Sequence, residues 1–347
     1  MTSSYDVPIL VILFNRPKMV AGVMESVRSV RPIRLYVAGD GPREGRHEEA
    51  LCQEARKMAT VVDWPCEVIC LFQESNLGCK MGVATAINWF FSHEPLGIIL
   101  EDDLVPSRTF YPFMREMLHR YAQSPEIGMV NGCCPWPVQS SIRESYHFSS
   151  YTKPWGWATW ADRWVRHFDV TAQRYKACIP DVYRQFPLTR RFRRWWWSEL
   201  RLTVEYGLDT WDYQWQLAHY ANRLLVIRPR SNLVANRGDG RDATHTFTVD
   251  RACVATQDIA LPLVHPRSIC WDRKADVRLE RAHVSAWMGG GMARRLMTLP
   301  LRLTRKALRI AGVLPGAPAA PDHDSALVRI HRGHRENPFF GSTFDRL

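Results

Sequence analysis

The chain has 347 residues, of which 46% are hydrophobic and 11% aromatic, so it can bury a large core and is not globally disordered. Its formal net charge of +11 leaves three classes of partner open: nucleic acid, an anionic membrane surface or a phosphorylated small molecule. The nine cysteines form no CxxC pair and no set at zinc spacing, which favours a reduced chain without a structural zinc.

The first residues carry no recognisable targeting or membrane-spanning segment. Residues 1–6 are polar, and the apolar run at 7–14 is far shorter than the roughly 20 residues that span a bilayer. We therefore expect a soluble, cytoplasmic protein.

Short apolar runs alternate with helix-length segments over residues 1–135. Apolar runs of this length are typical of strands buried on both faces of a parallel sheet. We predict strands at residues 8–14, 34–39, 67–72, 97–100 and 127–130. We predict helices at residues 17–30, 44–60, 82–92 and 110–121. The repetition predicts a doubly wound α/β sheet, whose ligands bind at the carboxyl ends of the strands.

Three of these strands end in polar residues, and the acidic end of the fourth is the most informative. Glu101, Asp102 and Asp103 follow the apolar run directly. If the strand geometry persists, Glu101 and Asp103 point to one face and Asp102 to the other. Such carboxylates can hold a hard cation, Mn²⁺ or Mg²⁺, that neutralises a departing diphosphate. The alternative is a helix cap, with Asp103 or Ser107 at the start of the next helix.

The composition shifts toward Trp, Arg and Tyr after residue 135, and strand signals become sparse except at 224–228. Three strings then suggest a family: NLGCKMGVATAINWFF at 76–91, GIILEDDLVPSRTFYPF at 97–113 and WGWATW at 155–160. Together they resemble bacterial family-2-type glycosyltransferases, and the EDD strand end is similar to that of the N-acetylglucosaminyltransferase I group. The resemblance covers residues 7–250. It implies a GT-A fold, a Rossmann-like nucleotide-diphospho-sugar transferase with a mostly parallel central sheet.

The resemblance also implies a nucleotide-sugar donor and a metal at the acidic strand end. In that reading Asp103 ligates the metal, Asp102 contacts the ribose and Glu101 supports the site by hydrogen bonding. Asn15 and Arg16 match a position that contacts the nucleotide.

Two further donor contacts come from the resemblance. Asp40 matches an acid that hydrogen-bonds uracil, which implies a UDP-sugar, and Lys80 matches a basic nucleotide contact. A tight turn is the alternative for Asp40 and Gly41. The histidine that the animal enzymes carry near Lys80 is absent.

Asp212 is the candidate general base of an inverting hexosyl- or N-acetylhexosaminyltransferase. An inverting transferase needs one carboxylate within reach of the acceptor hydroxyl. The resemblance places Asp212 in that role, since the related enzymes carry a Trp-Asp pair at this point. Asp209 is the nearest competitor, and a polar helix start is the alternative for Asp212.

Aromatic residues are candidates for the acceptor site because the apolar faces of sugars stack on aromatic rings. Trp155, Trp157 and Trp211 are the predicted acceptor contacts, and packing in the core is the alternative for each. His245 follows a Gly-rich loop and resembles a further metal or phosphate ligand, with a surface-loop histidine as the alternative.

These expectations divide the chain into four parts. Residues 1–135 form the nucleotide-sugar-binding half, 136–265 the acceptor-binding and catalytic half, 266–312 a basic helical extension and 313–347 a flexible tail. After Pro300, the basic positions 302, 305, 306 and 309 share one helical face. That face predicts peripheral binding to the anionic inner face of the membrane, next to a glycan or lipid-linked glycan acceptor. A helix docked on the domain is the alternative.

Three other functions compete with glycosyl transfer. A nucleotidyltransferase that makes nucleotide sugars would carry a glycine-rich phosphate loop after the first strand, where this chain has FNRP. Nucleic-acid binding would need basic and aromatic residues interleaved on one scaffold, a pattern that the sequence lacks. A non-catalytic carbohydrate-binding relative is the third alternative, although the EDD and Trp-Asp elements are intact.

Overall fold

The computed structural model describes residues 5–134, 143–238 and 255–289. The chain divides into two compact units, Met1–Ala286 and Trp287–Leu347, and the described residues lie almost entirely in the first. The predicted basic helix and tail after residue 289, and His245, fall outside the described residues. Within the described ranges, no helix combines the length and the apolar character needed to cross a membrane.

One eight-stranded sheet forms the centre of the first unit, in the order β3-β2-β1-β4-β8-β6-β9-β7. Its strands are β1 (Ile9–Leu13), β2 (Arg34–Gly39), β3 (Glu67–Phe72), β4 (Leu96–Glu101), β6 (Ile127–Asn131), β7 (Tyr146–Ser149), β8 (Trp157–Trp160) and β9 (Leu225–Pro229). Strands β3, β2, β1 and β4 are mutually parallel, as are β6 and β9, whereas β8 and β7 run antiparallel to their neighbours. The predicted α/β fold with a mostly parallel central sheet is confirmed. A separate ribbon pairs β5 (Leu104–Pro106) with β10 (Val234–Asn236).

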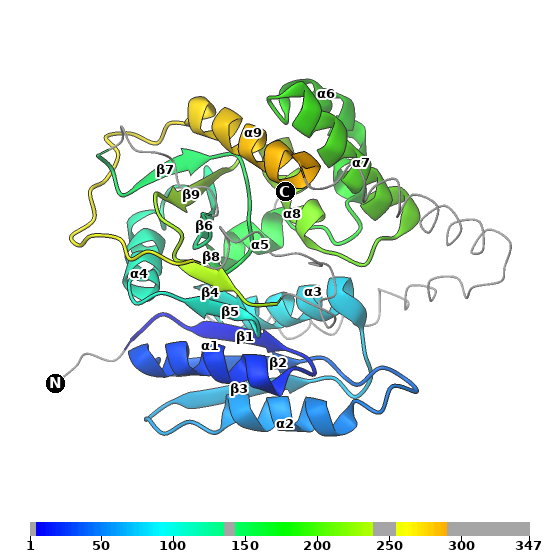
Figure 1. Cartoon of the computed structure of the whole chain (residues 1–347), viewed down its shortest axis with the longest axis vertical. Helices are drawn as coiled ribbons and strands as arrows, with labels where there is room; N and C mark the ends of the chain where they lie inside the picture. Colours follow the sequence, from blue (N-terminus) through cyan, green and yellow to red (C-terminus); the bar gives the residue numbers. More distant parts are fainter. Residues whose placement is uncertain (1–4, 135–142, 239–254, 290–347) are drawn as a thin grey trace, which may run out of the picture. The chain divides into compact units, whose positions relative to one another are not determined.

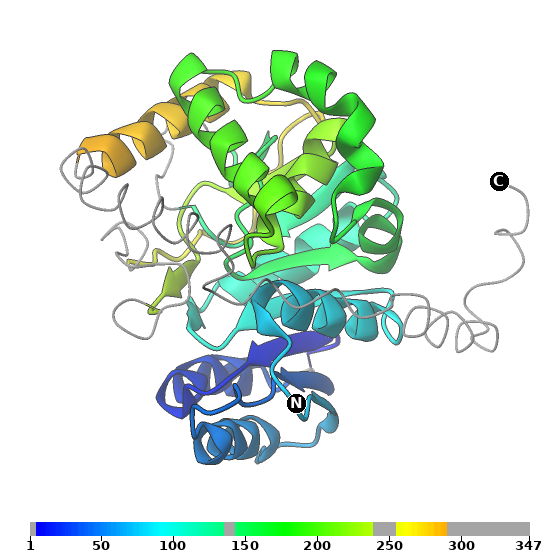
Figure 2. The same cartoon turned by 90° about the vertical axis from the view of Figure 1, so that its right-hand side faces the viewer.

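Helices cover both faces of this sheet. They are α1 (Pro17–Val30), α2 (Glu49–Thr60), α3 (Gly78–Phe91), α4 (Phe110–Arg120), α5 (Ala161–His167), α6 (Ile179–Gln185), α7 (Arg190–Tyr206), α8 (Asp212–Asn222) and α9 (Arg273–Gly289), with a 3-10 helix at Gln173–Cys178. Apolar side chains of α1, α2 and α4 form one buried cluster with one face of the sheet, and those of α3, α5, α7 and α8 form a second with the other. Figures 1 and 2 show α1 and α2 at the β1–β3 end of the sheet and α6, α7 and α9 at the opposite end.

The sequence patterns located most of the elements of residues 1–135, and β9, within a few residues, whereas α5 to α9 were not predicted. β2, β3 and α1 have the predicted bounds. α2 begins at Glu49 rather than at residue 44, because Gly45 and His47 adopt positive φ values of 69° and 54° that a helix cannot contain. The prediction that every strand is buried on both faces is wrong for β3, an edge strand whose side chains are all partly or fully exposed.

The two predicted halves share the central sheet. Strand β8 comes from the second half but lies between β4 and β6 of the first, and its first residue, Trp157, pairs with Ile99 and Asn131. The loop before β8 therefore reaches the carboxyl ends of β4 and β6. Gly156 in this loop has φ +61°, and a Cβ there would lie 2.7 Å from the Val234 side chain. The absence of a side chain at Gly156 therefore lets the loop before β8 pack closely against Val234 of β10.

Candidate active site at the carboxyl ends of the strands

The acidic strand end meets the loop that follows β1. Glu101 ends β4, and Asp102 and Asp103 form the turn that leads into β5, so the alternating strand geometry stops at Glu101. The buried Asp102 carboxylate accepts hydrogen bonds from the Phe14 amide at 3.4 Å and from Arg16 Nε at 3.3 Å. Arg16 also forms an ion pair with each of the two aspartates, and its Nη2 lies 3.1 Å from Asp103 Oδ2.

Negative charge outweighs positive charge at this strand end. Burial, followed by the charges of Asp103 and Asp102, raises the pKa of Glu101. Burial also raises the pKa of Asp102, although Arg16 opposes the shift. For Arg16, burial lowers the pKa but the two aspartates outweigh it and raise the pKa. Three carboxylates therefore face one guanidinium, and an additional cation would relieve their repulsion.

The residues present fit a divalent cation that shares its ligands with a substrate. Asp103 keeps 12% of its side chain exposed, whereas Asp102 is held by Arg16 and Phe14. The described ranges contain no group of three or more His, Cys, Asp or Glu side chains arranged to hold a metal by themselves. Mg²⁺ in proteins is commonly bound by one or two carboxylates together with substrate phosphates.

The helix-capping alternative does not account for the acids. Thr109 precedes α4, and its amide donates to Asp258 Oδ1 at 3.1 Å, so a residue far along the chain caps this helix.

Asp103 instead contacts the two residues that follow β10, Arg237 and Gly238. The Arg237 amide donates to the Asp103 carbonyl at 2.9 Å, and a Cβ on Gly238 would lie 2.0 Å from Asp103 Oδ2. Any side chain at Gly238 would therefore require the Asp103 carboxylate to move.

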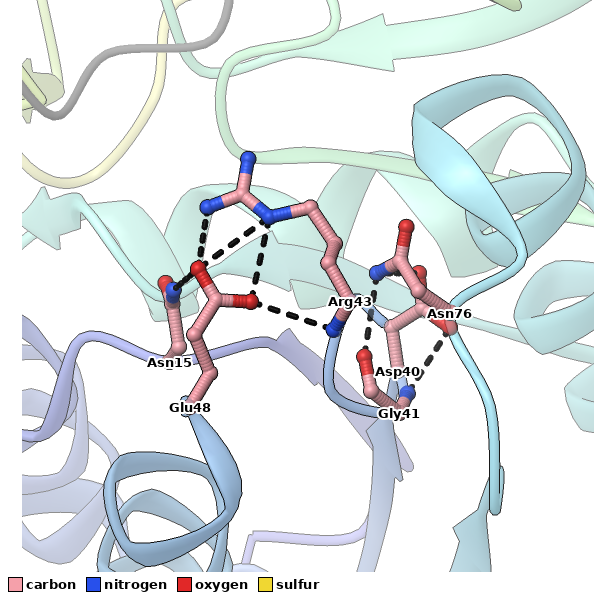
Figure 3. Close-up of polar contacts among 6 residues, drawn as sticks. All are labelled: Asn15, Asp40, Gly41, Arg43, Glu48 and Asn76. Atoms are coloured by element: carbon pink, nitrogen blue, oxygen red, sulfur yellow. Dashed lines mark hydrogen bonds and ion pairs between the residues drawn. The ribbon is translucent and has the colours of Figure 1, made fainter. Parts of the chain in front are cut away.

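Asp40, the predicted uracil contact, binds the start of α3 (Figure 3). Its carboxylate accepts from the Gly41 amide at 2.9 Å and from Asn76 Nδ2 at 2.8 Å. It also accepts from the amides of Leu77 at 2.8 Å and Gly78 at 3.2 Å, which the figure does not draw. Burial raises the pKa of Asp40, while these amide donors oppose the shift. Asp40 thus holds the β2–α2 turn against α3, which agrees with the turn alternative, and the uracil contact stays a prediction.

Replacing Asp40 by alanine should lower the free energy of unfolding by about 1–3 kcal/mol, because part-buried donors at the start of α3 lose their acceptor. Urea denaturation followed by circular dichroism measures the change. The control is Asp63→Ala, which removes an exposed ion pair with Arg28 and should cost less than about 1 kcal/mol. Equal stability of the two variants would contradict the role given to Asp40.

Asn15, the predicted nucleotide contact, also bonds to the protein itself (Figure 3). Its Nδ2 donates to Glu48 Oε1 at 3.0 Å, and Glu48 in turn accepts from the amide and guanidinium of Arg43. The guanidinium of Arg43 lies 5.3 Å from the centre of the Phe14 ring. No sequence motif marked Glu48 or Arg43 as a site residue. The structure places both beside Asn15 and Phe14, the residues that follow β1.

Asp209, the competitor of Asp212, also binds the start of α3. Its Oδ2 accepts from the Cys79 amide at 2.9 Å and its Oδ1 from the Lys80 amide at 2.8 Å. Together with Asp40 it takes the free amides of the first turn of α3, where an isolated helix would offer a phosphate site. Lys80 is fixed here by its amide, and the nucleotide contact predicted for its side chain stays a prediction.

Asp212 lies at the first position of α8 and retains a carboxylate oxygen for chemistry. Its Oδ1 accepts from the Thr210 hydroxyl and from the Tyr213 amide, whereas Oδ2 accepts no hydrogen bond from the described residues. Asp212 is close enough to raise the pKa of Glu101 further, after the larger effects of burial and the neighbouring aspartates. The structure therefore brings the candidate base to the acidic strand end, although the two are more than 100 residues apart.

The predicted acceptor tryptophans divide into buried and accessible residues. Trp157 and Trp211 are 1% and 3% exposed, and their rings stack with centroids 5.7 Å apart. Both lie in the core, which agrees with the core-packing alternative, and the acceptor contact stays a prediction for each. Trp155 is only half-buried, so it stays the candidate sugar platform. Lys153 Nζ lies over its ring, 3.6 Å from the ring centre.

Comparison with known proteins identifies no family for the chain. No protein-family model matches it, and no curated protein matches it in sequence. HddC from Yersinia pseudotuberculosis is 12% identical with a TM-score of 0.23, over 32% of this chain and 54% of that one, so the chain spans about half the length of that protein. The apo form of mouse xyloside xylosyltransferase 1 is 11% identical with a TM-score of 0.32, over 62% of this chain and 81% of that one. At such values neither match defines the activity of this chain.

Proposed function

We propose that this protein is a GT-A-type glycosyltransferase that uses Mn²⁺ or Mg²⁺ and a nucleotide-diphosphate sugar, a UDP-sugar by the resemblance at Asp40. The observation that carries the proposal is the acidic strand end, where three carboxylates face a single arginine beside Asp212. A bound divalent cation would supply stabilisation of the charge on the departing nucleotide diphosphate. Asp103 would hold that cation, and Arg16, which pairs with Asp103, would add positive charge beside the diphosphate.

The start of α3 supports this placement of the diphosphate. Helix N-termini commonly bind phosphates, but Asp40 and Asp209 already occupy the amides of α3. Two carboxylates there also repel an anion. In this proposal the neutralising charge for a diphosphate therefore comes from a cation held at the acidic strand end and from Arg16.

Asp212 would act on the acceptor. Its unbonded Oδ2 would take the proton from the attacking hydroxyl, while Thr210 and the Tyr213 amide hold Oδ1 in place. One carboxylate is sufficient for an inverting displacement, because the leaving diphosphate needs no protein acid once its charge is neutralised. The half-buried Trp155 would offer a ring face to the acceptor sugar.

We extend the proposal to a surface-glycan or lipid-linked glycan as acceptor at the inner face of a membrane. The support is the basic face of residues 302–309 and the overall charge of +11. Removal of residues 290–347 should then reduce binding to anionic vesicles and leave nucleotide binding unchanged.

The experiment that tests the donor half of the proposal is calorimetric titration of the full chain with UDP, GDP and dTDP, each with and without Mn²⁺. We expect one nucleotide, UDP, to bind only with the metal. Binding of a nucleoside triphosphate with release of pyrophosphate would favour a nucleotidyltransferase. Folded protein that binds no nucleotide would favour a non-catalytic carbohydrate-binding relative.

A further inference from the structure

We propose that Asp209 is a positioning residue that fixes Asp212 against the acidic strand end through its hydrogen bonds to α3. The inference rests on the proposed role of Asp212 as general base. Asp209 lies in the loop between α7 and α8, and it reaches amides that are 130 and 129 residues earlier in the chain. No other described side chain bonds this loop to the amides of α3.

The start of α3 is shaped to admit this carboxylate. Gly78 has φ +79°, and a Cβ at this position would lie 2.8 Å from Asp209 Oδ2. Any residue other than glycine would therefore be strained and would push Asp209 away. The neighbouring amides of Leu77 and Gly78 go to Asp40, so each carboxylate has its own pair of amides at the start of α3.

Contacts of Thr210, the residue that follows Asp209, couple the position of Asp209 to that of Asp212. Thr210 is buried, its hydroxyl donates to Asp212 Oδ1 and its carbonyl accepts from Gln214 Nε2 at 2.8 Å. Because only Thr210 and Trp211 separate the two acids, the α3 contact and the Asp212 side chain belong to one short hydrogen-bonded segment. That segment ties Asp212 to the start of α3, and Asp212 is close enough to Glu101 to raise its pKa.

The same contacts argue against Asp209 as the base. Each of its oxygens already accepts an amide hydrogen, whereas Asp212 Oδ2 accepts none from the described residues. Protonation of Asp209 would weaken these amide bonds, because a neutral carboxyl group is a poorer acceptor than a carboxylate. In this proposal Asp209 therefore holds the loop in place.

The test compares Asp209→Asn with Asp212→Asn in the full chain. An asparagine at 209 keeps one acceptor oxygen but turns an NH₂ group toward the second amide. We expect amide hydrogen exchange to speed up in the peptide that covers residues 77–82. We also expect kcat for sugar transfer to fall about 10- to 100-fold, with the donor KM and the pH profile unchanged, since the base is present but misplaced. Asp212→Asn should retain wild-type exchange at 77–82 and lose transfer.

Glu205→Gln is the matched control, because it removes an exposed acid of α7 that pairs with Arg201 and has no contact with α3. It should change neither exchange nor kcat. Normal kcat in Asp209→Asn, or wild-type exchange at 77–82, would overturn the positioning role alone. Accelerated exchange in Asp209→Asn, in a protein whose wild type transfers no sugar, would overturn the proposed function and the positioning role with it.

Discussion

Asp103→Ala should abolish metal-dependent nucleotide binding while the chain stays folded. Asp103 and Glu101 are both partly accessible, but Asp103 alone of the two is paired with Arg16, and Asp102 is committed to Arg16 and Phe14. Loss of a residue that only supports a metal ligand already costs about 10- to 100-fold in affinity, so loss of the ligand itself should exceed about 100-fold. Calorimetry with the nucleotide that the wild type binds, with and without Mn²⁺, measures the effect.

The fold should tolerate this substitution. The backbone carbonyl of Asp103, which accepts from the Arg237 amide, is retained in alanine. Removal of the charge also relieves the repulsion that raises the pKa of Glu101. Circular dichroism and the melting temperature should therefore match those of the wild type.

Asp181→Ala controls for the loss of one negative charge, because Asp181 is an exposed residue of α6 paired with Arg184. It should bind nucleotide and Mn²⁺ normally. Unchanged binding in Asp103→Ala would show that the metal ligand is wrongly assigned, and Glu101 would be the next carboxylate to replace.

The fold was predictable where local pattern determines it. The apolar run of β2 and the one-sided apolar spacing of α1 gave their bounds. The start of α2 was missed because a charged stretch does not reveal that Gly45 and His47 turn the backbone to positive φ. The exposure of β3 was missed because an apolar run looks the same in a central strand and in an edge strand that helices cover only partly.

The candidate site was predictable only in its outline. The sequence placed acids at strand ends, since a strand visibly stops where its apolar run stops. It could not show that Asp209 bonds to amides 130 residues earlier, because a cap supplied by a distant loop leaves no local pattern. It also could not separate Trp155 from Trp157, because core packing and sugar stacking favour the same side chain. Burial decides between them, and burial is a property of the tertiary structure.

Asp212→Asn should leave nucleotide binding intact and remove sugar transfer. Asparagine has the size of aspartate, and its carbonyl oxygen can still accept from the Thr210 hydroxyl and the Tyr213 amide. A neutral amide cannot take the proton of the acceptor hydroxyl, so the rate should fall by about 10²- to 10⁴-fold. The measurement is the transfer of labelled sugar from the donor to a membrane glycan fraction, alongside calorimetry of the same variant.

The donor side of the site gives an internal control. Asp212 contributes to the raised pKa of Glu101, so its neutralisation eases the repulsion there and should not weaken binding of the metal and nucleotide. A variant that loses both transfer and nucleotide binding would indicate that Asp212 belongs to the donor site.

Near-normal transfer by Asp212→Asn would disprove the assignment of the base and would direct attention to Glu101 rather than Asp209. Both oxygens of Asp209 are held by α3 amides, whereas no described residue donates a hydrogen bond to the Glu101 carboxylate. Because burial and the neighbouring aspartates raise the pKa of Glu101, a reaction that used it as base would gain rate only as the pH rises through that elevated pKa. The position of the pH profile would then identify which carboxylate takes the proton.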